Sequence, residues 1–481
     1  MKNLVSLLDQ EGIKHSISEK IVVEGLCYDS RKIKKGDLFF AIPGSQVDGH
    51  QYLSQVSTAG AVAAIVEKIS DDAIPQIVVP NVLETMALLS NLFFDKPSEK
   101  IRVVGMTGTN GKTTTTYLIE DILKKNNKKC GVMGTVNYRM GDELFPAPNT
   151  TPQSLDVNMF FSELVRREIF FGVMEVSSHA LVQHRVDHIQ YEVAVFSNLT
   201  QDHLDYHKTM ENYYQAKALL FLRPESPCAV INIDDEYGAR LFKELGEGLS
   251  YGFSSSAMLR AKNEKYTLSG IEFDVVFPSG KTLKISNNLL GKYNIYNCLA
   301  AAGALLSLGF SDEEVSEGLN QNHRIPGRLE RVEAGQNYVV VVDYAHTPDA
   351  LEQVLITLKN TGPRKLFCIF GAGGDRDRGK RPKMGAVAVK MADRVFVTSD
   401  NPRTENPQKI ISDILEGIVP LNKNNHVVVE DRSLAIRQAV KEAGTGDIVL
   451  IAGKGHENYQ IIGNTKHHFS DFEEAEKAIR G

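Results

Sequence analysis

The chain has 481 residues, of which 42% are hydrophobic and 24% charged, and its formal net charge is −6. At ~150 residues per domain this length predicts about three domains, and the composition excludes a mostly disordered chain. No part of the sequence is strongly basic, so we expect no nucleic-acid partner. No apolar run approaches the ~18–20 residues that cross a bilayer, and the apolar stretch at 4–8 is too short for a signal peptide. We therefore expect a cytoplasmic protein without membrane contact.

Short apolar runs alternate with helical patterns after a polar, proline-containing linker at 95–100. In the middle of the chain the patterns predict strands at 101–104, 170–176, 192–196 and 229–233, and helices at 212–222 and 293–308. A capping box at 311–314 begins a further helix. After a second break near 326–328, they predict strands at 338–342, 365–370, 394–398, 426–429 and 448–451, and helices at 348–359, 382–391, 407–418 and 433–443.

This alternation predicts an α/β protein of three domains with mostly parallel sheets. We place the domains at residues 1–98, 99–328 and 329–481. Ligands of such sheets bind beyond the carboxyl ends of the strands and in clefts between domains.

A glycine-rich turn joins the strand at 101–104 to a helix and ends in Gly-Lys-Thr-Thr, residues 111–114. Glycines allow backbone N–H groups to approach phosphate oxygens, and the start of the helix adds partial positive charge. Lys112 can reach the β- and γ-phosphates, and the Thr113 hydroxyl can hold Mg²⁺. The general phosphate-loop pattern has glycine where Met106 stands, and Gly105 comes one residue early. The alternative is a glycine turn that binds nothing.

The variant T-G-T-N-G-K-T-T at 107–114 is typical of the Mur ligases, and the sequence resembles this family over nearly its full length. Among them it is most similar to the members that add 2,6-diaminopimelate. The matching segments are Y-D-S-R (28–31), G-T-N-G-K-T-T (108–114), N-T-T (149–151), E-V-S-S-H-A-L-V-Q-H-R (175–185), N-L-T-Q-D-H-L-D-Y-H (198–207), A-K (216–217), G-K-Y-N-I-Y-N (291–297), D-Y-A-H-T-P-D-A-L (343–351), G-G-D-R-D-R-G-K-R-P (373–382), D-N-P-R-T-E (400–405) and A-G-K-G-H-E (452–457).

The resemblance implies a central P-loop-type ATPase domain, an N-terminal UDP-sugar-binding domain and a C-terminal Rossmann-like domain that binds the amino acid. It implies that ATP phosphorylates a carboxylate of UDP-N-acetylmuramoyl-L-Ala-D-Glu. The amine of meso-diaminopimelate then attacks the acyl phosphate, in peptidoglycan precursor synthesis. We expect a monomer that uses these three small molecules.

The resemblance also assigns the metal and phosphate residues. Glu175 and Thr113 would ligate Mg²⁺, with His203 beside them. Lys217 would carry a CO₂-derived carbamate (N6-carboxylysine) as a further metal ligand, a modification that requires a neutral amine and hence a depressed pKa. By pattern alone Lys217 is a helix-surface lysine and Glu175 a solvated loop residue. The catalytic residues implied are Lys112, Glu175, His203 and Lys217.

The substrate-binding residues follow in the same way. Those implied for ATP are Gly108, Thr109, Asn110, Gly111, Lys112, Thr113, Thr114, Asn294, Arg328, Asp343 and His346. Those implied for the UDP-muramoyl dipeptide are Tyr28, Ser30, Ser45, Gln46, Val47, Asn149, Thr150, Thr151, Ser177, Gln183 and Arg185. The alternative for Arg328 and Asp343 is a linker arginine and a strand-end carboxylate that caps local backbone.

The segment at 400–403 separates diaminopimelate from lysine, because diaminopimelate carries a second carboxylate that a guanidinium can bind through paired hydrogen bonds. Arg403 is the candidate, and Glu457 could accept from the distal ammonium. The residues implied are Arg376, Asp400, Asn401, Pro402, Arg403, Gly453 and Glu457, with Asp400 as a helper that positions loops. The alternative for Arg403 is an ion pair between loops.

Three other functions remain open at this stage. A lysine-adding ligase of the same family would differ mainly at Asn401 and Arg403. A folylpolyglutamate synthetase would share the phosphate loop but is not expected to carry the segments at 175–185 and 400–403. A nucleotide-binding protein without activity would release no phosphate.

Overall fold

The computed structural model describes residues 1–15, 17, 20–44, 47–72, 74–223 and 227–481. The chain forms two compact units. Unit 1 contains residues 1–259 and 300–315, and unit 2 contains residues 260–299 and 316–481. Helices α10 (Lys292–Ser307) and α11 (Asp312–Leu319) contribute residues to both units. The expected domain boundaries at 98 and 328 stay predictions.

The N-terminal part of unit 1 is built around a small parallel sheet. Its elements are β1 (Lys2–Asn3), α1 (Leu4–Gln10), β2 (Val22–Val23), β3 (Gly25–Cys27), β4 (Asp37–Phe40), the 3₁₀ helix η1 (Gly49–Tyr52), α2 (Leu53–Thr58), β5 (Ala63–Val66), β6 (Gln76–Val78), α3 (Val82–Phe93) and η2 (Pro97–Lys100). The sheet order is β3–β4–β5–β6. Leu7 of α1 and Leu89 of α3 pack with Phe40 and Ile65 of the sheet in one core.

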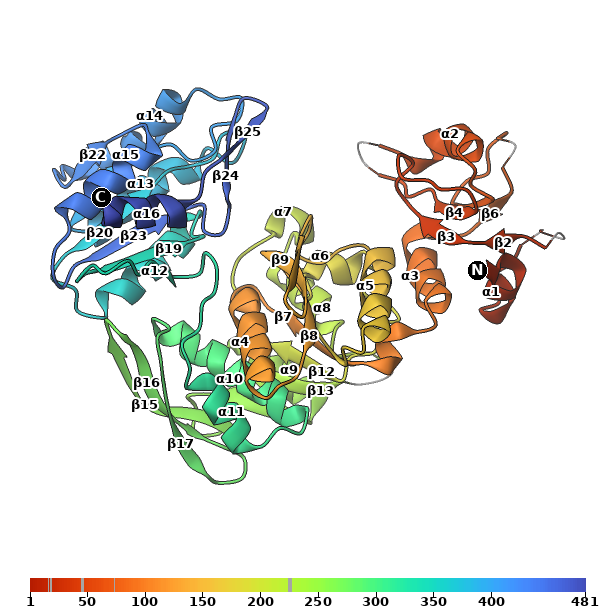
Figure 1. Ribbon diagram of the computed structural model, residues 1–481, viewed down its shortest axis with the longest axis horizontal. Coiled ribbons are helices and arrows are strands. Elements are labelled where there is room, and N and C mark those ends of the chain that lie inside the picture. The colour runs from red at the N-terminus through yellow and green to blue at the C-terminus, as the bar shows by residue number, and fades with distance from the viewer. Residues whose placement is uncertain (16, 18–19, 45–46, 73, 224–226) are drawn as a thin grey trace. The chain divides into compact units, whose positions relative to one another are not determined.

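The rest of unit 1 contains a larger, mostly parallel sheet. Its elements are β7 (Arg102–Thr107), α4 (Lys112–Lys125), β8 (Cys130–Met133), β9 (Asn137–Met140), β10 (Glu143–Pro146), α5 (Ser154–Arg166), β11 (Phe171–Glu175), α6 (Ser178–Val182), β12 (Val193–Phe196), α7 (Leu204–His207), α8 (Met210–Ala218), β13 (Cys228–Asn232), α9 (Glu236–Leu245) and β14 (Leu249–Gly252). Strands β8, β11, β7, β12, β13 and β14 are parallel neighbours in that order, and β9 and β10 add an antiparallel hairpin. Helix α4 runs alongside β7, β8 and β11 (Figure 1).

Unit 2 holds a second doubly wound sheet and an antiparallel ribbon. Its elements are β15 (Leu259–Thr267), β16 (Gly270–Val276), β17 (Thr282–Asn287), β18 (Glu330–Arg331), β19 (Val339–Asp343), α12 (Pro348–Lys359), β20 (Leu366–Phe370), α13 (Lys380–Met391), β21 (Arg394–Val397), α14 (Pro407–Ile418), η3 (Val419–Leu421), β22 (His426–Val428), α15 (Arg432–Glu442), β23 (Ile448–Ala452), β24 (Tyr459–Ile462), β25 (Thr465–His468) and α16 (Asp471–Arg480). The sheet order is β18–β19–β23–β20–β21–β22, parallel except for β18.

Alternating strand residues in unit 2 pack against two layers of helices. Val341 and Leu450 belong to the core formed with α12, α13 and α14, whereas Val340 and Val449 belong to the core formed with α15 and α16. A sheet buried on both faces requires apolar residues on both sides of each strand, and every residue of β20 and β23 is buried. The predicted α/β class with a Rossmann-like C-terminal region is confirmed.

The predicted elements of both sheets are present, with ends that shift by a few residues. Ser311 and Glu314 form the expected capping box through reciprocal hydrogen bonds of 2.8 and 3.2 Å. Elements that the sequence did not predict include those of the small N-terminal sheet, β8, α5, α9 and β14, the antiparallel strands β15, β16 and β17, the two hairpins β9–β10 and β24–β25, and α16. Four of the five cysteines are buried, and Cys228 is exposed.

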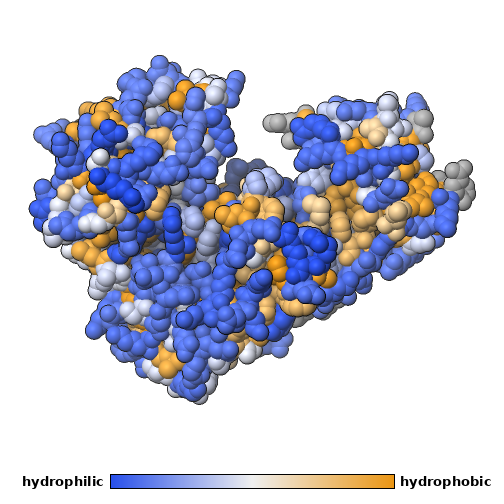
Figure 2. Space-filling model, viewed as in Figure 1, coloured by the Kyte–Doolittle hydropathy of each residue, from blue (hydrophilic) through white to orange (hydrophobic). Residues whose placement is uncertain are grey.

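The surface face drawn in Figure 2 is mostly hydrophilic, with apolar residues in scattered patches. In the described part of the chain, no helix is long and apolar enough to cross a membrane.

Arg432 and Asp471 form an ion pair that joins α15 to α16, and both side chains are fully buried. Two hydrogen bonds of 2.7 Å connect the guanidinium to the carboxylate. Because Asp471→Ala leaves the guanidinium buried without its counterion, we expect the free energy of unfolding to fall by about 3–5 kcal/mol. Chemical denaturation followed by circular dichroism measures the change. Glu476→Ala, which removes an exposed pair with Arg480, is the control and should unfold as the parent chain does; equal effects would contradict the prediction.

Candidate active site

The phosphate-loop turn follows β7 and leads directly into α4. Gly108 and Gly111 have φ angles of 144° and 91°, a region that side chains other than glycine rarely adopt. A Cβ on Gly108 would lie 1.9 Å from Ser197 Oγ, so the turn also needs glycine for space. Asn110 N–H donates to Asn198 Oδ1 at 3.0 Å and Ser197 Oγ donates to the Asn110 carbonyl at 2.6 Å. These contacts fix the turn against the segment that follows β12.

Two lysine side chains meet at this turn. Lys112 Nζ and Lys217 Nζ both donate to the carbonyl oxygen of Gly108, at 2.9 and 2.8 Å. Lys217 is only 1% exposed, so its alternative interpretation as a helix-surface lysine is wrong. Burial, with a contribution from the charge of Lys112, holds the pKa of Lys217 well below the usual lysine value.

Glu175 ends β11, next to β7 in the sheet and in register with Met106. Its side chain is buried, which rules out a solvated loop glutamate. Thr135 fixes the carboxylate by donating from its backbone N–H and from its hydroxyl, both at 2.9 Å. A Cβ on Gly134 would approach Glu175 Oε1 to 2.5 Å, so glycine at 134 makes room for the carboxylate.

Oxygen donors suitable for Mg²⁺ are present at this edge of the sheet. Glu175 offers a carboxylate and Thr113, which is 4% exposed, offers a hydroxyl, and hard cations prefer oxygen ligands. Among the described residues, no group of three or more His, Cys, Asp or Glu side chains could hold a metal ion. The donor set therefore fits Mg²⁺ only in company with other oxygens, such as those of a nucleotide or of a modified Lys217.

A cluster of aromatic and histidine rings lies between α6, α7 and α8. His203 precedes α7 with a left-handed φ of 52°, and its ring centroid is 4.9 Å from that of His179 and 6.2 Å from that of Tyr213. The Tyr213 ring lies 4.6 Å from Lys217 Nζ, and its hydroxyl is 3.3 Å from Thr109 Oγ1. His207 stacks on Tyr213 and lies 2.9 Å from Ser178 Oγ. The cluster links Lys217 to the phosphate loop.

Five residues predicted for the UDP-muramoyl dipeptide lie close to Glu175: Thr150, Thr151, Ser177, Gln183 and Arg185. Thr151 Oγ1 donates to the Glu175 carbonyl at 2.9 Å and accepts from Ser177 N–H at 3.0 Å. Arg185 donates to the Thr151 carbonyl at 2.9 Å and to Gln183 Oε1 at 2.7 Å. Thr150 Oγ1 is 3.0 Å from Thr135 Oγ1. Asn149, which precedes Thr150, accepts at its carbonyl from the Tyr138 hydroxyl at 2.6 Å.

The N-terminal residues predicted for the same substrate are less well connected. Tyr28 donates its hydroxyl to Asp156 Oδ2 at 2.6 Å, a bond between the small sheet and α5. Burial, together with this hydrogen bond, raises the pKa of the tyrosine, and burial also raises the pKa of Asp156. Val47 is exposed and Ser30 is partly buried. Ser45 and Gln46 lie outside the described residues.

The remaining residues predicted for ATP belong to unit 2. Asn294 is buried at the start of α10 and donates to the Leu290 carbonyl at 2.8 Å. Asp343 accepts from the backbone N–H groups of Leu329 and Ala345 at 2.8 and 2.9 Å, so the local capping interpretation of this carboxylate is also satisfied. Arg328 and His346 both lie near the Tyr344 ring, whose centroid is 5.3 Å from the Arg328 guanidinium carbon and 4.7 Å from the His346 ring centroid.

The residues predicted for the amino acid gather in unit 2, after β20, β21 and β23. Asn401 donates to Glu457 Oε2 at 2.8 Å, and its Oδ1 accepts from Ile461 N–H at 2.9 Å. Lys454, fully buried, lies within 3.3 Å of both Asn401 and Glu457. A Cβ on Gly453 would lie 2.8 Å from Asp400 Oδ2, and Asp400 is buried.

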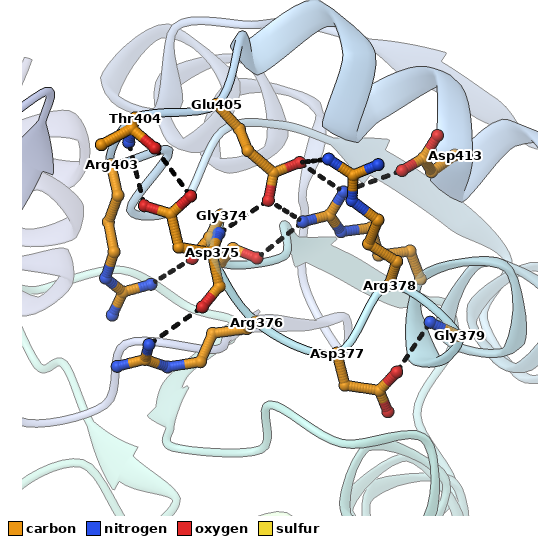
Figure 3. Close-up of polar contacts among 12 residues, drawn as sticks. Gly374, Asp375, Arg376, Asp377, Arg378, Gly379, Arg403, Thr404, Glu405 and Asp413 are labelled. Atoms are coloured by element: carbon orange, nitrogen blue, oxygen red, sulfur yellow. Dashed lines mark hydrogen bonds and ion pairs between the residues drawn. The ribbon is translucent and has the colours of Figure 1, made fainter. Parts of the chain in front are cut away.

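Arg376 and Arg403 present their guanidinium groups on the same side of two adjacent loops (Figure 3). Arg403 donates to the Gly374 carbonyl at 2.7 Å and Arg376 to the Asp375 carbonyl at 3.0 Å. Arg403 thus forms a loop-to-loop hydrogen bond, but to a carbonyl rather than the carboxylate of an ion pair. A Cβ on Gly374 would lie 1.9 Å from the Pro402 carbonyl, so the two loops approach this closely only because residue 374 is glycine.

Sequence reasoning missed several residues that hold these groups in place: Thr135, Asp156, Tyr213 and Lys454. Lys454 lies inside the segment 452–457, but the sequence alone predicts no role for this lysine. The contacts of Thr135 and Asp156 join residues 40 and 128 positions apart, and no local pattern marks such partners.

Comparison with known proteins identifies the family of this chain. The Mur ligase family catalytic domain matches residues 22–92, the Mur ligase middle domain residues 106–305, and the Mur ligase glutamate ligase domain residues 327–455. The UDP-N-acetylmuramoyl-L-alanyl-D-glutamate–2,6-diaminopimelate ligase of Geobacter metallireducens is 45% identical over 95% of this chain and 94% of its own length. An enzyme of the same name from Clostridium acetobutylicum is 43% identical over 96% and 95%.

A solved structure of a ligase with that name aligns with a TM-score of 0.73 and 35% identity, covering 98% of each chain. The identity and coverage of these relatives, together with the three domain matches, assign the chain to one family. The chain belongs to the Mur ligase family.

Proposed function

We propose that this chain is the ATP-dependent ligase that joins meso-2,6-diaminopimelate to UDP-N-acetylmuramoyl-L-alanyl-D-glutamate, with release of ADP and phosphate. Relatives of 43–45% identity over nearly the whole chain carry this name, which supports the reaction. The observation that carries the choice of amino acid is the pair of guanidinium groups, Arg376 and Arg403, beside Asn401 and Glu457.

The reaction requires activation of a carboxylate, because oxide is a poor leaving group. Transfer of the γ-phosphoryl group of ATP to the carboxylate gives an acyl phosphate. The amine attacks its carbonyl carbon to form a tetrahedral intermediate, which releases phosphate as the new amide forms. ATP, the reacting carboxylate and the acyl phosphate are anionic, so the site must supply cations and aligned N–H groups.

Lys112 and the turn at 108–111 are suited to holding the triphosphate. The first backbone N–H groups of a helix have no partner within the helix, and those at the start of α4 would stabilise a phosphate oxygen bound at the turn. In the described structure Lys112 Nζ rests on the Gly108 and Thr109 carbonyls at 2.9 Å each. Phosphate oxygens would draw the ammonium away from these neutral acceptors, because charge-assisted hydrogen bonds are the stronger ones.

Thr113 and Glu175 would hold Mg²⁺, which when bound neutralises charge on the phosphates. Thr135 keeps the Glu175 carboxylate in one orientation through its two hydrogen bonds. That orientation is fixed before any ligand arrives, which lowers the cost of ordering the site.

Lys217 is the proposed site of carbamylation. Its neutral amine attacks CO₂, an N–C bond forms, the electron pair of one C=O bond moves to oxygen, and the proton leaves to solvent. The neutral amine beside Lys112 thereby becomes an anion, which the Lys112 ammonium attracts. Support for this proposal comes from the burial of Lys217 and its contact with the Gly108 carbonyl.

Recognition of the UDP-muramoyl dipeptide is assigned to the cluster around Thr151 and Arg185. Arg185 Nε is buried and has no hydrogen-bond partner among the described residues. A buried donor without an acceptor is costly, and an anionic group of the substrate would satisfy it. Asn294, Arg328, Asp343 and His346 are also proposed to contact the nucleotide.

Recognition of diaminopimelate over lysine follows from charge. The distal carboxylate of diaminopimelate would pair with the Arg403 guanidinium, and Glu457 would accept from the distal ammonium. Lysine would leave the arginine without an anion, and sites with unpaired polar groups reject such analogues strongly. Arg403 therefore favours diaminopimelate over the lysine-adding alternative.

The reaction is tested by supplying ATP, Mg²⁺ and UDP-N-acetylmuramoyl-L-alanyl-D-glutamate with either diaminopimelate or lysine. We expect phosphate release and formation of the amide product with diaminopimelate, and both at least about 100-fold slower with lysine. Coupled phosphate assay and mass spectrometry of the product provide the two readouts. Nucleotide binding without an amide product would contradict the proposal, and equal use of lysine would contradict its specificity.

Arg403→Ala tests the assignment of the distal carboxylate. Loss of a charge-assisted pair predicts a rise in KM for diaminopimelate of about 10²-fold, with the KM for ATP unchanged. Arg394→Ala is the matched control, since it removes an arginine that pairs with Glu442 on the surface. The assignment fails if the two variants have the same diaminopimelate kinetics.

Carbamylation of Lys217 should depend on pH and CO₂. Because the pKa of this lysine is lowered, the neutral amine persists to lower pH than for an exposed lysine, and the carbamate should be lost as pH falls through that lowered pKa. We expect activity to fall in CO₂-free buffer, more steeply as the pH is lowered, and to return on adding bicarbonate. Carbon-13 NMR with labelled bicarbonate should show a carbamate in the parent chain and none in Lys217→Arg. Full activity of Lys217→Arg would rule out this role.

A further inference from the structure

The two arginines assigned to the amino acid depend on one loop for their position. Arg376 belongs to the loop at 373–379, and the Arg403 guanidinium donates to a carbonyl of that same loop, Gly374. The Arg403 backbone is held by residues outside that loop. Its N–H donates to the Ile461 carbonyl at 3.0 Å, and its carbonyl accepts from the Gly463 N–H at 2.7 Å. A shift of the loop at 373–379 would therefore move one guanidinium and release the other.

Glu405 connects this loop to the core of unit 2 (Figure 3). Its carboxylate accepts from the Asp375 backbone N–H at 2.6 Å, from Arg378 at 3.0 Å and from two nitrogens of Arg381 at 2.8 and 3.0 Å. The Glu405 side chain is 11% exposed and that of Arg381 is fully buried. These donors hold the pKa of Glu405 at about 2, so the carboxylate stays ionised throughout the neutral range.

Arg381 holds both Glu405 and the loop at 373–379 in place. Besides Glu405 it pairs with Asp413 of α14 at 2.8 Å and donates to the Gly373 carbonyl at 3.2 Å. The buried guanidinium thus fixes the start of the loop, and Glu405 fixes its centre at Asp375. Neither contact involves Arg376 or Arg403 directly.

The backbone of the two loops needs this support. Asp375 and Arg403 have φ angles of 53° and 52°, in the left-handed region that residues other than glycine seldom adopt. The Asp375 carboxylate also joins the two loops, because it accepts hydrogen bonds from the Thr404 backbone N–H at 3.1 Å and from the Thr404 hydroxyl at 2.8 Å. Strained conformations of this kind persist only where neighbouring contacts hold them.

We propose that Glu405 is a positioning residue which, through Asp375 and Arg381, sets the separation of the Arg376 and Arg403 guanidinium groups and so determines selectivity for an amino acid with a distal carboxylate. This inference rests on the proposed function for the identity of the substrate. A paired guanidinium site requires placement within about 0.5 Å, and Glu405 supplies the connection that maintains it.

The test variant is Glu405→Gln, which keeps the size of the side chain and removes its charge. We expect the KM for diaminopimelate to rise about 10-fold or more because the guanidinium pair is misplaced. The KM for ATP and kcat at saturating diaminopimelate should stay within about twofold of the parent chain, since the residue touches neither reacting group. The ratio of kcat/KM for diaminopimelate over lysine should fall.

Asp447→Asn is the matched control for loss of a buried carboxylate. Asp447 is fully buried, pairs with Arg364 at 2.6 Å and precedes β23, at the end of that strand opposite Gly453. This variant should lower the thermal midpoint without changing the KM for diaminopimelate. A role of Glu405 in folding alone would give both variants the same kinetics, and that result would overturn the proposal.

Thr404→Val provides a second test. It is the test that applies in case Glu405→Gln does not fold. It removes only the hydroxyl donor to Asp375 on an exposed part of the loop, and a smaller rise in the KM for diaminopimelate is expected. An unchanged KM in the folded variants overturns the inference while leaving the proposed function intact. Failure of the parent chain to form an amide with diaminopimelate overturns the proposed function itself.

Discussion

The carbonyl oxygen of Gly108 accepts hydrogen bonds from two lysines, and the chemistry of the site depends on this arrangement. Lys112 and Lys217 approach the same acceptor within 2.9 Å, although Lys112 is only four residues from Gly108 and Lys217 comes from α8. A charged ammonium at the buried Lys217, so close to the half-buried Lys112, is unfavourable. The repulsion between the two lysines falls when phosphate oxygens bind Lys112 and when Lys217 loses its charge. The same geometry would therefore favour both nucleotide binding and a modified lysine.

Much of the fold could be predicted, because buried parallel strands leave a strong local pattern. The runs that became β11, β12, β19, β20 and β23 are continuous apolar segments, and helices α12 and α14 have the predicted bounds. The antiparallel strands β15, β16 and β17 have a weaker pattern, which β15 interrupts with the consecutive polar residues Lys262, Asn263 and Glu264, so periodicity did not predict these strands. The hairpins depend on partners distant in space, which periodicity does not reveal.

Site residues could be predicted where they lie in recognisable sequence segments. Residues that hold them in place through contacts distant in sequence could not be predicted. The phosphate loop gave Lys112 from its own spacing, whereas the burial of Lys217 follows only from the packing of α8 against the turn. In unit 2, the sequence indicated Arg403, but the ion pair of Glu405 with Arg381 joins residues 24 positions apart. Such supporting contacts have no local signature, because any acid and base at suitable positions in the fold would serve.

The central claim is that the chain activates a carboxylate by phosphorylating it, and isotope transfer tests this most directly. UDP-N-acetylmuramoyl-L-alanyl-D-glutamate labelled with oxygen-18 in its reacting carboxylate would be converted in unlabelled water, and the released phosphate would be analysed by mass spectrometry. Our account predicts that each phosphate released during amide formation carries one labelled oxygen from the substrate. Phosphate without that label, formed at the same rate as the amide, would contradict it.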